Sequence, residues 1–293
     1  MSGVYYSTSK LRVTLPVSKE SYIILRSEPI VNLRLLSSSG TGPGIGSAYS
    51  YAIESPSGGG VSTELLKVDE HTGDLWVTSG IYELKNVTEF IVVARNATGQ
   101  MPAARLSLTI EPQPVAEGAL DSFCEHHPER ACFWDTVQYR VAENGPRNWT
   151  IGTVGPAFYR RLCPQHQPVY ELLRGEGLNP AGGADRYLLV APSDGTLRTK
   201  VSFDHDTHAP GPILQASVRC TLQQREKATG GFGGGSQSVD RTITLNVLDR
   251  NDNLPRLESA NGSVVSGQDH QDQDLPSYEV YVDDPHVNKV REV

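Results

Sequence analysis

Residues 249–255 read Asp249-Arg250-Asn251-Asp252-Asn253-Leu254-Pro255, and this stretch decides the fold. It follows an alternating run at residues 242–247, in which Ile243, Leu245 and Val247 face one side of a strand. The acidic and amide side chains therefore leave a sheet at its tip, where carboxylate, amide and carbonyl oxygens can surround a Ca²⁺ ion. Pro255 blocks continuation of the strand and starts a new segment. A turn rich in Asp and Asn that needs no metal is the alternative interpretation.

The order of these residues resembles the calcium linker that joins successive cadherin repeats. Cadherin repeats also end their first strand in Glu, often as Glu-Asn, and Glu143-Asn144 has that form here. They carry a Leu-Asp-Arg-Glu motif as well, for which Phe203-Asp204-His205-Asp206 stands in this sequence. The resemblance implies Ca²⁺ as the cofactor and the following ligands: Glu143, Asn144, Asp204, Asp206, Asp249, Asn251, Asp252 and Asn253. Asp206 is one methylene shorter than the family's Glu, so either the metal shifts toward Asp206 or one ion is bound more weakly.

Composition and charge narrow the classes of partner. The chain has 293 residues, with 28 Gly and 19 Pro, and this length suits two domains of about 100 to 150 residues. A net charge of −8 without a basic run argues against nucleic acid or an anionic membrane surface as the partner. No apolar run is long enough to cross a membrane and no signal sequence opens the chain. We therefore expect a soluble, mature segment from which a leader or anchor has been removed.

Cysteines and glycosylation sequons indicate a secreted or cell-surface protein. Asn-X-Ser/Thr sequons occur at Asn86, Asn96, Asn148 and Asn261. Four cysteines occur at Cys124, Cys132, Cys163 and Cys220, and the sequence alone leaves three pairings open, of which Cys124–Cys132 is the local one. A zinc site within residues 124–132, which include two histidines, is the alternative, although its spacing matches no common zinc motif. Disulfides are the interpretation that suits an oxidising compartment.

Two series of short alternating segments divide the chain. The first occupies residues 11–17, 30–36, 48–53, 74–78, 90–94 and 105–110, and the second occupies residues 137–141, 169–173, 187–190, 214–218 and 242–247. No stretch has a convincing helical period. Residues 68–75 in the first series and 193–197 in the second resemble the same cadherin turn, which contains Gly73 and Gly195 respectively. We therefore predict an all-β chain of two cadherin-like antiparallel β-sandwich domains, at residues 1–115 and 116–255.

Two differences between the series carry further expectations. The second series is longer, and the excess matches the polar, glycine-rich stretch at residues 223–237, for which we expect one expanded, flexible hairpin loop. No Lys-Ser/Thr pair follows these glycines, which argues against a phosphate-binding loop. The first series ends in Glu111-Pro112-Gln113-Pro114-Val115, with a single carboxylate, and has Lys85 where the second has its acidic motif. We therefore predict that the junction between the domains is free of calcium and is held by direct packing.

A more specific resemblance covers about residues 130–255. Residues 140–146, 158–164 and 170–178 are similar to the second cadherin-like domain of Ret-like receptor tyrosine kinases. That family has four such domains, with calcium between the second and third and with the first packed on the second. The resemblance implies the disulfides Cys124–Cys163 and Cys132–Cys220. Residues 256–293 would then begin a third domain or form a disordered tail, with Asp283 and Asp284 as further ligands, and the cysteine-free first domain suggests an invertebrate relative.

Function is expected to follow from recognition rather than catalysis. His205 lies between two aspartates, but no Ser or Cys nucleophile motif accompanies it, so we predict no catalytic residue. In Ret-like receptors this region contacts a GPI-anchored co-receptor that presents a growth factor. The resemblance therefore implies a ligand-binding ectodomain segment on the extracellular face of the plasma membrane, with its transmembrane and kinase parts elsewhere. The alternative is a homophilic adhesion cadherin, although Val4-Tyr5-Tyr6 stands where strand-swapping cadherins need an early Trp.

Overall fold

The computed structural model describes residues 4–37, 49–54, 65–96, 102–174, 183–206, 210–225 and 232–250. Contacts between residues divide the chain into one unit at residues 1–250 and a second at 251–293, and the second lies outside the described residues. The expected third-domain segment therefore has no structural description here. Within the first unit two β-sandwiches follow one another along the chain, and the predicted boundary between residues 115 and 116 stays a prediction.

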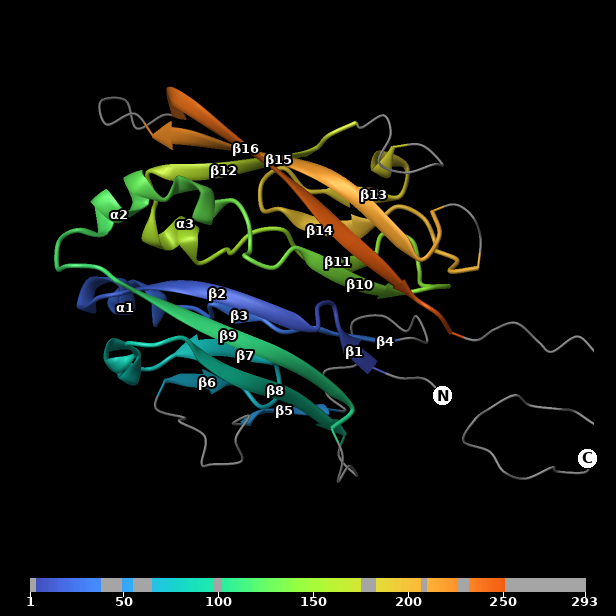
Figure 1. Ribbon diagram of the computed structural model, residues 1–293, viewed down its shortest axis with the longest axis horizontal. Coiled ribbons are helices and arrows are strands. Elements are labelled where there is room, and N and C mark those ends of the chain that lie inside the picture. The colour runs from blue at the N-terminus through green and yellow to red at the C-terminus, as the bar shows by residue number, and fades with distance from the viewer. Residues whose placement is uncertain are drawn as a thin grey trace, which may run out of the picture. The chain divides into compact units, whose positions relative to one another are not determined.

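The N-terminal sandwich is built from a four-stranded and a three-stranded sheet, with a separate two-stranded pair beside them (Figure 1). The four-stranded sheet has the order β2 (Lys10–Val17), β9 (Ala104–Pro114), β8 (Thr88–Asn96), β5 (Tyr49–Glu54). The three-stranded sheet has the order β3 (Val31–Asn32), β7 (Asp74–Val77), β6 (Leu66–Val68), and the pair consists of β1 (Val4–Tyr6) and β4 (Leu35–Ser37).

The C-terminal sandwich repeats this plan. Its four-stranded sheet has the order β10 (Gln138–Ala142), β16 (Phe232–Leu248), β15 (Ile213–Arg225), β12 (His166–Leu172). Its three-stranded sheet has the order β11 (Thr150–Thr153), β14 (Thr196–Thr199), β13 (Leu188–Val190). The prediction of an all-β chain is confirmed. The pairing is antiparallel with one exception in each four-stranded sheet. β2 runs parallel to β9, and β10 runs parallel to β16. In each case the parallel pair joins the strands that come first and last in the chain order of that sheet.

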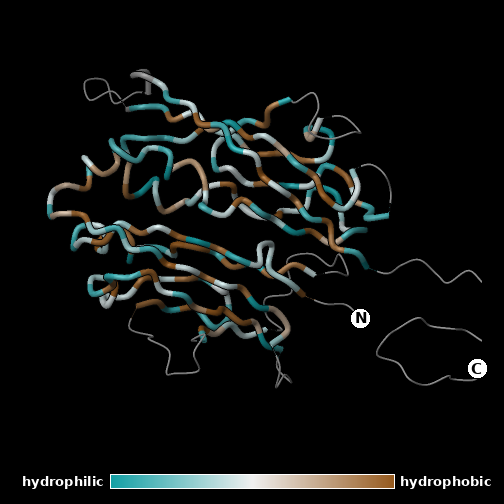
Figure 2. Tube along the Cα trace, in the orientation of Figure 1, coloured by the Kyte–Doolittle hydropathy of each residue, from teal (hydrophilic) through white to brown (hydrophobic). Residues whose placement is uncertain are grey.

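The strands form because their apolar residues alternate with polar ones, which Figure 2 shows as brown and teal changing along the strands. In β16, Ile243, Leu245 and Val247 are buried, as the period of two predicts. In β9 the same alternation buries Leu106 and Leu108. Each sandwich therefore closes over the inward faces of its two sheets.

The repeated turns need glycine for a conformational reason. Gly73 and Gly195 have φ values of 74° and 69°, which L side chains rarely adopt. A Cβ at Gly73 would also lie 2.6 Å from the carbonyl oxygen of Leu33. Both turns are closed by an aspartate, since Asp69 Oδ1 accepts from the Thr72 amide at 2.8 Å and Asp194 Oδ1 accepts from the Thr196 amide at 2.9 Å. The two series are therefore alike in turn chemistry as well as in strand order.

Three short segments are helical, although no stretch of the sequence has a convincing helical period. These are α1 (Lys19–Leu25), α2 (Leu120–His126) and α3 (Tyr159–Leu162), accompanied by 3₁₀ turns η2 (Ser79–Glu83), η3 (Pro128–Ala131) and η4 (Ala184–Arg186). α1 is held by a capping box, in which Ser18 Oγ accepts from the Ser21 amide and Ser21 Oγ accepts from the Ser18 amide. Seven residues are too few for a helical period to stand out. No helix in the described residues is long and apolar enough to span a bilayer.

The expanded loop expected at residues 223–237 is largely strand. β15 continues to Arg225 and β16 begins at Phe232, with Gln223 opposite Ser236 and a register irregularity beyond it. Glycine weakens a strand but leaves its backbone hydrogen bonds intact, so the hairpin extends through part of the glycine-rich sequence. The tip, residues 226–231, lies outside the described residues.

Direct contacts join the two sandwiches. The Arg140 amide donates to the Ser7 carbonyl oxygen at 2.7 Å, and Arg161 Nη1 lies 2.7 Å from Glu28 Oε2. The Arg161 side chain is about four-fifths buried, and burial lowers the pKa of its guanidinium while the neighbouring Glu28 opposes that shift. Buried apolar residues of both sandwiches belong to one contiguous core cluster. Apolar packing and hydrogen bonds thus hold the sandwiches against each other.

Candidate metal centre

Glu143 is positioned by the parallel pairing of the first and last strands of the C-terminal sandwich. β10 and β16 are in register with Ala142 opposite Leu248. Parallel strands end at the same edge of a sheet, so Glu143 and Asp249, the residues that follow, come to one edge. The Glu143 amide donates to the Leu248 carbonyl oxygen at 3.0 Å and fixes this junction.

The Glu143 side chain is fully buried and accepts two backbone hydrogen bonds. Its Oε2 accepts from the His205 amide at 2.6 Å, and its Oε1 accepts from the Arg250 amide at 2.7 Å. A buried carboxylate needs such charge-assisted hydrogen bonds or an opposite charge to offset the loss of hydration. The carboxylate therefore ties the end of β10 to two segments that follow it far along the chain.

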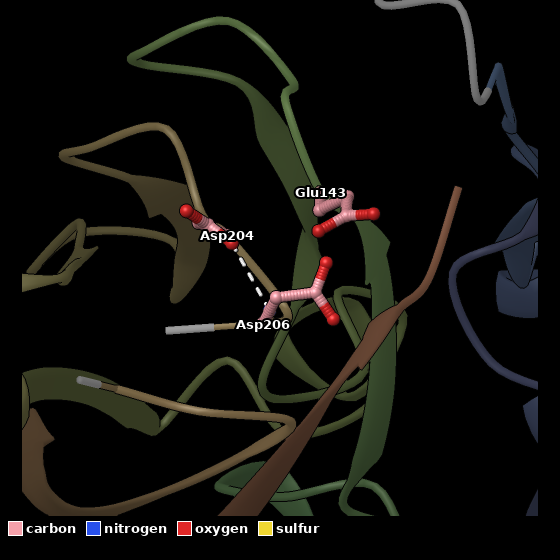
Figure 3. Close-up of side chains that lie close together, drawn as sticks. All are labelled: Glu143, Asp204 and Asp206. Atoms are coloured by element: carbon pink, nitrogen blue, oxygen red, sulfur yellow. Dashed lines mark hydrogen bonds between the residues drawn. The ribbon is translucent and has the colours of Figure 1, made fainter. Parts of the chain in front are cut away.

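Two aspartates from the loop after β14 complete the acidic cluster. Phe203 is buried and anchors this loop, and its carbonyl oxygen accepts from the Asn144 amide at 2.8 Å. Asp204 Oδ1 accepts from the Asp206 amide at 3.0 Å, which turns the backbone so that both carboxylates lie near Glu143 (Figure 3). One carboxylate oxygen from each of the three residues lies within 4.8 Å of the others.

The chemistry of these donors fits a hard divalent cation. All three are carboxylates, the ligand type that Ca²⁺ prefers, and gathering three negative charges is unfavourable without an opposing charge. His205 Nδ1 lies 3.5 Å from Asp206 Oδ1, but this imidazole is a cation only when protonated. Such a cluster could hold Ca²⁺ through Glu143, Asp204 and Asp206 at an edge that Asp249 shares.

Of the remaining predicted ligands apart from Asp249, only Asn144 lies within the described residues. Asn144 follows Glu143 directly, is exposed and has a φ of 57°, a left-handed conformation that Asn tolerates better than most residues. The other predicted ligands lie outside the described residues, and these are Asn251, Asp252, Asn253, Asp283 and Asp284. The structure thus brings Glu143, Asp204 and Asp206 together, and the linker residues 251–253 stay a prediction.

The four cysteines form two disulfides. Cys124 is bonded to Cys163 and Cys132 to Cys220, with Cα–Cα distances of 5.6 and 5.7 Å. This is the pairing that the Ret-like resemblance implies. It overturns the zinc alternative and the local Cys124–Cys132 pair, because no described cysteine is free to bind a metal or to pair differently.

Three of the four predicted glycosylation asparagines are described, and all three are exposed. Asn86 precedes β8, Asn96 ends it, and Asn148 lies in the turn before β11 with a φ of 59°. Asn261 lies outside the described residues. The positions of the first three are compatible with a glycan, which requires a surface asparagine.

Sequence reasoning missed the groups that hold the site and the sandwiches together. The His205 and Arg250 amides are backbone donors, so no side-chain motif in the sequence predicts their role. Between the sandwiches, Tyr5 Oη accepts from the Ala142 amide at 2.6 Å, and burial raises the pKa of Tyr5 to about 12. An early tyrosine is ordinary in composition, and only the fold shows its partner.

Comparison with known proteins supports the fold. No family model and no curated protein matches the chain. Among solved structures, cadherin-like domains 1 to 4 of zebrafish RET are similar to it, with a TM-score of 0.58 and 13% identity over 88% of this chain and 50% of that one. The chain therefore spans about half the length of that structure.

Two further structures of cadherin repeats are similar at a lower level. Mouse cadherin-23 EC22-24 has a TM-score of 0.28 and 13% identity over 86% of this chain and 68% of that one. Protocadherin gamma B2 domains 3–6 have a TM-score of 0.31 and 13% identity over 88% and 77%. Together with the sheets described above, the similarity to the zebrafish structure shows that this chain has the cadherin-like β-sandwich fold.

Proposed function

We propose that this chain is the membrane-distal ectodomain segment of a Ret-like receptor tyrosine kinase, stabilised by calcium and recognising a growth factor together with a GPI-anchored co-receptor. One observation carries the proposal. Acidic side chains gather at the C-terminal end of the second sandwich, whereas direct contacts join the first sandwich to the second. An extended adhesive rod would instead be expected to place calcium ligands at every junction.

The first junction has the chemistry of a packed interface. Glu111, the single carboxylate of residues 111–115, pairs with Arg12, whose Nη2 lies 2.9 Å from its Oε2. Thr14 Oγ1 donates to Asp135 Oδ2 at 2.9 Å and so links the two sandwiches. Carboxylates engaged by an arginine and a hydroxyl are poor candidates for calcium ligands.

Calcium in this proposal rigidifies the second sandwich toward the domain that follows. The ion would be held by Glu143, Asp204, Asp206 and Asp249, with the linker residues Asn251, Asp252 and Asn253 completing its coordination. The ion would neutralise the buried Glu143 and its two acidic neighbours. Because calcium would bind the folded state and not the unfolded chain, it would raise the free energy of unfolding.

The cellular setting follows from the same features. Two disulfides and exposed sequon asparagines favour an oxidising, glycosylating compartment, in keeping with an ectodomain on the extracellular face of the plasma membrane. A first domain without cysteines favours an invertebrate receptor. We propose that the segment acts by binding, with the kinase and transmembrane parts of the receptor elsewhere.

The decisive experiment separates a heterotypic receptor from a homophilic cadherin. We expect the chain to sediment as a monomer at micromolar concentration in millimolar Ca²⁺, and to be captured by the ectodomain of a growth-factor co-receptor in the presence of its growth factor. Asp204→Asn/Asp206→Asn should weaken capture, whereas Glu70→Gln, which removes a charge from an exposed turn, should not. Calcium-dependent homodimers without heterotypic capture would favour the adhesion alternative.

A further inference from the structure

A cavity of about 500 Å³ lies between the two sandwiches, away from the acidic cluster. The N-terminal sandwich contributes the segment after β1 and the segment leading into β3, and the C-terminal sandwich contributes β10, β11 and β14. Ligand sites for small molecules have volumes of about 300 to 1,000 Å³ and occur preferentially where domains meet. The cavity is therefore of a size and in a place suited to a small ligand.

The walls of the cavity are largely apolar and come from both sides. Leu11, Ile30 and Leu33 line it from the N-terminal sandwich. Trp134 and Tyr139 line it from the C-terminal sandwich, and their polar atoms are occupied: Trp134 Nε1 donates to the Thr153 hydroxyl, and Tyr139 Oη donates to the Thr153 carbonyl oxygen. These two rings therefore present their apolar surface to the cavity's contents.

The cavity lining has more positively than negatively charged side chains. Arg34 and Arg198 line the cavity together with one carboxylate, Glu28. Glu28 is engaged by Arg161, which lies outside the lining, at 2.7 Å. The lining therefore favours a negatively charged occupant.

Two donors at the cavity lack acceptors within the described part of the chain. In β14, Leu197 and Thr199 face the core of the sandwich, whereas Arg198 lines the cavity, and its Nε is buried without a hydrogen-bond partner there. Tyr6 also lines the cavity, and its Oη is likewise buried and without a partner. Burial and the neighbouring Tyr51 raise the pKa of Tyr6, so the phenol stays a donor at neutral pH. Both atoms are covered by protein, so an occupant would reach the Arg198 guanidinium through its terminal nitrogens, which are not among the buried, unpartnered atoms of the described residues.

We propose that this cavity binds a small amphipathic organic acid. The acid group pairs with the Arg198 guanidinium, whose planar donors match carboxylate or sulfonate oxygens, and the apolar body packs on Trp134 and Tyr139. Because both sandwiches line the cavity, the ligand also fastens them together. This site is independent of the calcium cluster and of the proposed receptor function.

Two fluorescent probes with one scaffold test the charge requirement on the full chain. 8-Anilinonaphthalene-1-sulfonate carries an acid group, and N-phenyl-1-naphthylamine lacks it. We expect the sulfonate to bind one-to-one with a Kd of about 100 µM or tighter. Arg198→Gln should weaken the sulfonate at least tenfold and leave the neutral probe unchanged. Arg105→Gln, which removes an equal charge from an exposed position of β9 outside the lining, should change neither.

A filled cavity tests the location. A Cβ at Gly152 would lie 3.5 Å from Ser7 Oγ and 3.6 Å from Tyr139 Cε1, both ordinary contacts, so Gly152→Ala should bind both probes as before. Gly152→Leu places a larger group in the cavity and should abolish binding of both. If Gly152→Leu does not fold, the Arg198→Gln comparison decides alone. Absence of sulfonate binding, equal loss of both probes in Arg198→Gln, or undiminished binding by folded Gly152→Leu would overturn the proposal.

Discussion

At the scale of single residues, Glu143 has the most consequential environment. It is a fully buried carboxylate whose two oxygens accept from backbone amides of segments far along the chain, and it faces two other carboxylates. The amides stabilise its charge, and a bound cation would stabilise it further. The contribution of Glu143 to the free energy of unfolding should therefore have one part that depends on calcium and another that does not.

Glu143→Gln should expose both parts. The new amide group places an NH₂ donor against a backbone donor, so the free energy of unfolding in chelator should fall by about 1–3 kcal/mol. Loss of the carboxylate should also reduce calcium affinity at least tenfold and remove most of the rise in melting temperature caused by millimolar Ca²⁺. Thermal melts with Ca²⁺ and with chelator measure both, with Glu70→Gln as the control. An unchanged calcium-induced rise would contradict the assignment.

The environment of His166 should make the free energy of unfolding depend on pH. It is buried, burial lowers the pKa of its imidazole, and Glu125 opposes that shift. Neither ring nitrogen has a hydrogen-bond partner within the described residues. Below the ordinary histidine value of about 6.5 the unfolded chain takes up a proton that the folded chain resists, so stability is present above that pH and is lost as pH falls.

The measurement for His166 is a difference between variants. The melting temperature of the natural chain should fall between pH 7.5 and pH 5 at saturating Ca²⁺, and it should fall less in His166→Leu, which has no proton to bind. His71→Gln, at an exposed turn, should follow the natural chain. Equal slopes for the natural chain and His166→Leu would show that this histidine titrates normally.

At the scale of elements, one disulfide joins α2 to the end of α3, and the other connects a short helical segment to a sheet. Cys132 follows η3 and is bonded to Cys220 in the middle of β15, across a sequence separation of 88. Closing so long a loop restricts the unfolded chain, so Cys132→Ala/Cys220→Ala should lower the free energy of unfolding by about 2–5 kcal/mol. Denaturant melts measure this, with Thr221→Ala/Ser238→Ala, an exposed pair on the same hairpin, as the control. Non-reducing peptide mapping should recover both pairs, and a Cys124–Cys132 peptide would contradict the structure.

How far the sequence predicts the elements depends on whether their cause is local. Alternation such as that of Ile243, Leu245 and Val247 is local, and it located the strands of both four-stranded sheets. The two predicted series leave out four strands of three or four residues, which are β1, β6, β11 and β14. The helix α1 depends on two serines and on packing, and the extension of the β15–β16 hairpin depends on cross-strand pairing that overrides the low strand propensity of glycine. The two serines lie three positions apart but produce no helical period, and the cross-strand pairing is not visible in a short window of sequence.

In the candidate site, too, the sequence predicts some of the residues, and only the fold shows the others. The acidic residues Glu143, Asp204 and Asp206 could be named from motifs, because a resemblance fixes residue types at given spacings. The backbone donors at His205 and Arg250 could not, since they reach Glu143 from 62 and 107 residues away and involve no side chain of their own. The cavity between the sandwiches was likewise invisible, because its lining comes from segments whose proximity only the fold establishes.

At the scale of the whole molecule, the junction between the two sandwiches and the far end of the second sandwich have different chemistry. The sandwiches are joined by an apolar core, by the Arg161–Glu28 ion pair and by hydrogen bonds between β10 and the segment at β1. The far end of the second sandwich instead gathers three carboxylates, whose charge the proposed calcium ion would neutralise. Removing calcium should therefore loosen one end of the described unit and leave the packing of the sandwiches intact.

Amide hydrogen exchange measured by NMR distinguishes the two junctions in one sample. The Arg140 and Ala142 amides, which donate to Ser7 and Tyr5 across the sandwiches, should be protected equally in Ca²⁺ and in chelator. The His205 and Arg250 amides, which donate to Glu143, should lose protection at least tenfold in chelator, because three facing carboxylates without a cation favour local opening.

The core amide of Leu245 serves as the control, since loss of its protection would indicate unfolding of the whole unit. If Arg140 and Ala142 lose protection with calcium while Leu245 keeps it, the packing of the sandwiches depends on the metal. The first junction would then behave as a calcium linker does, and the prediction that direct packing holds the two sandwiches without calcium would be ruled out.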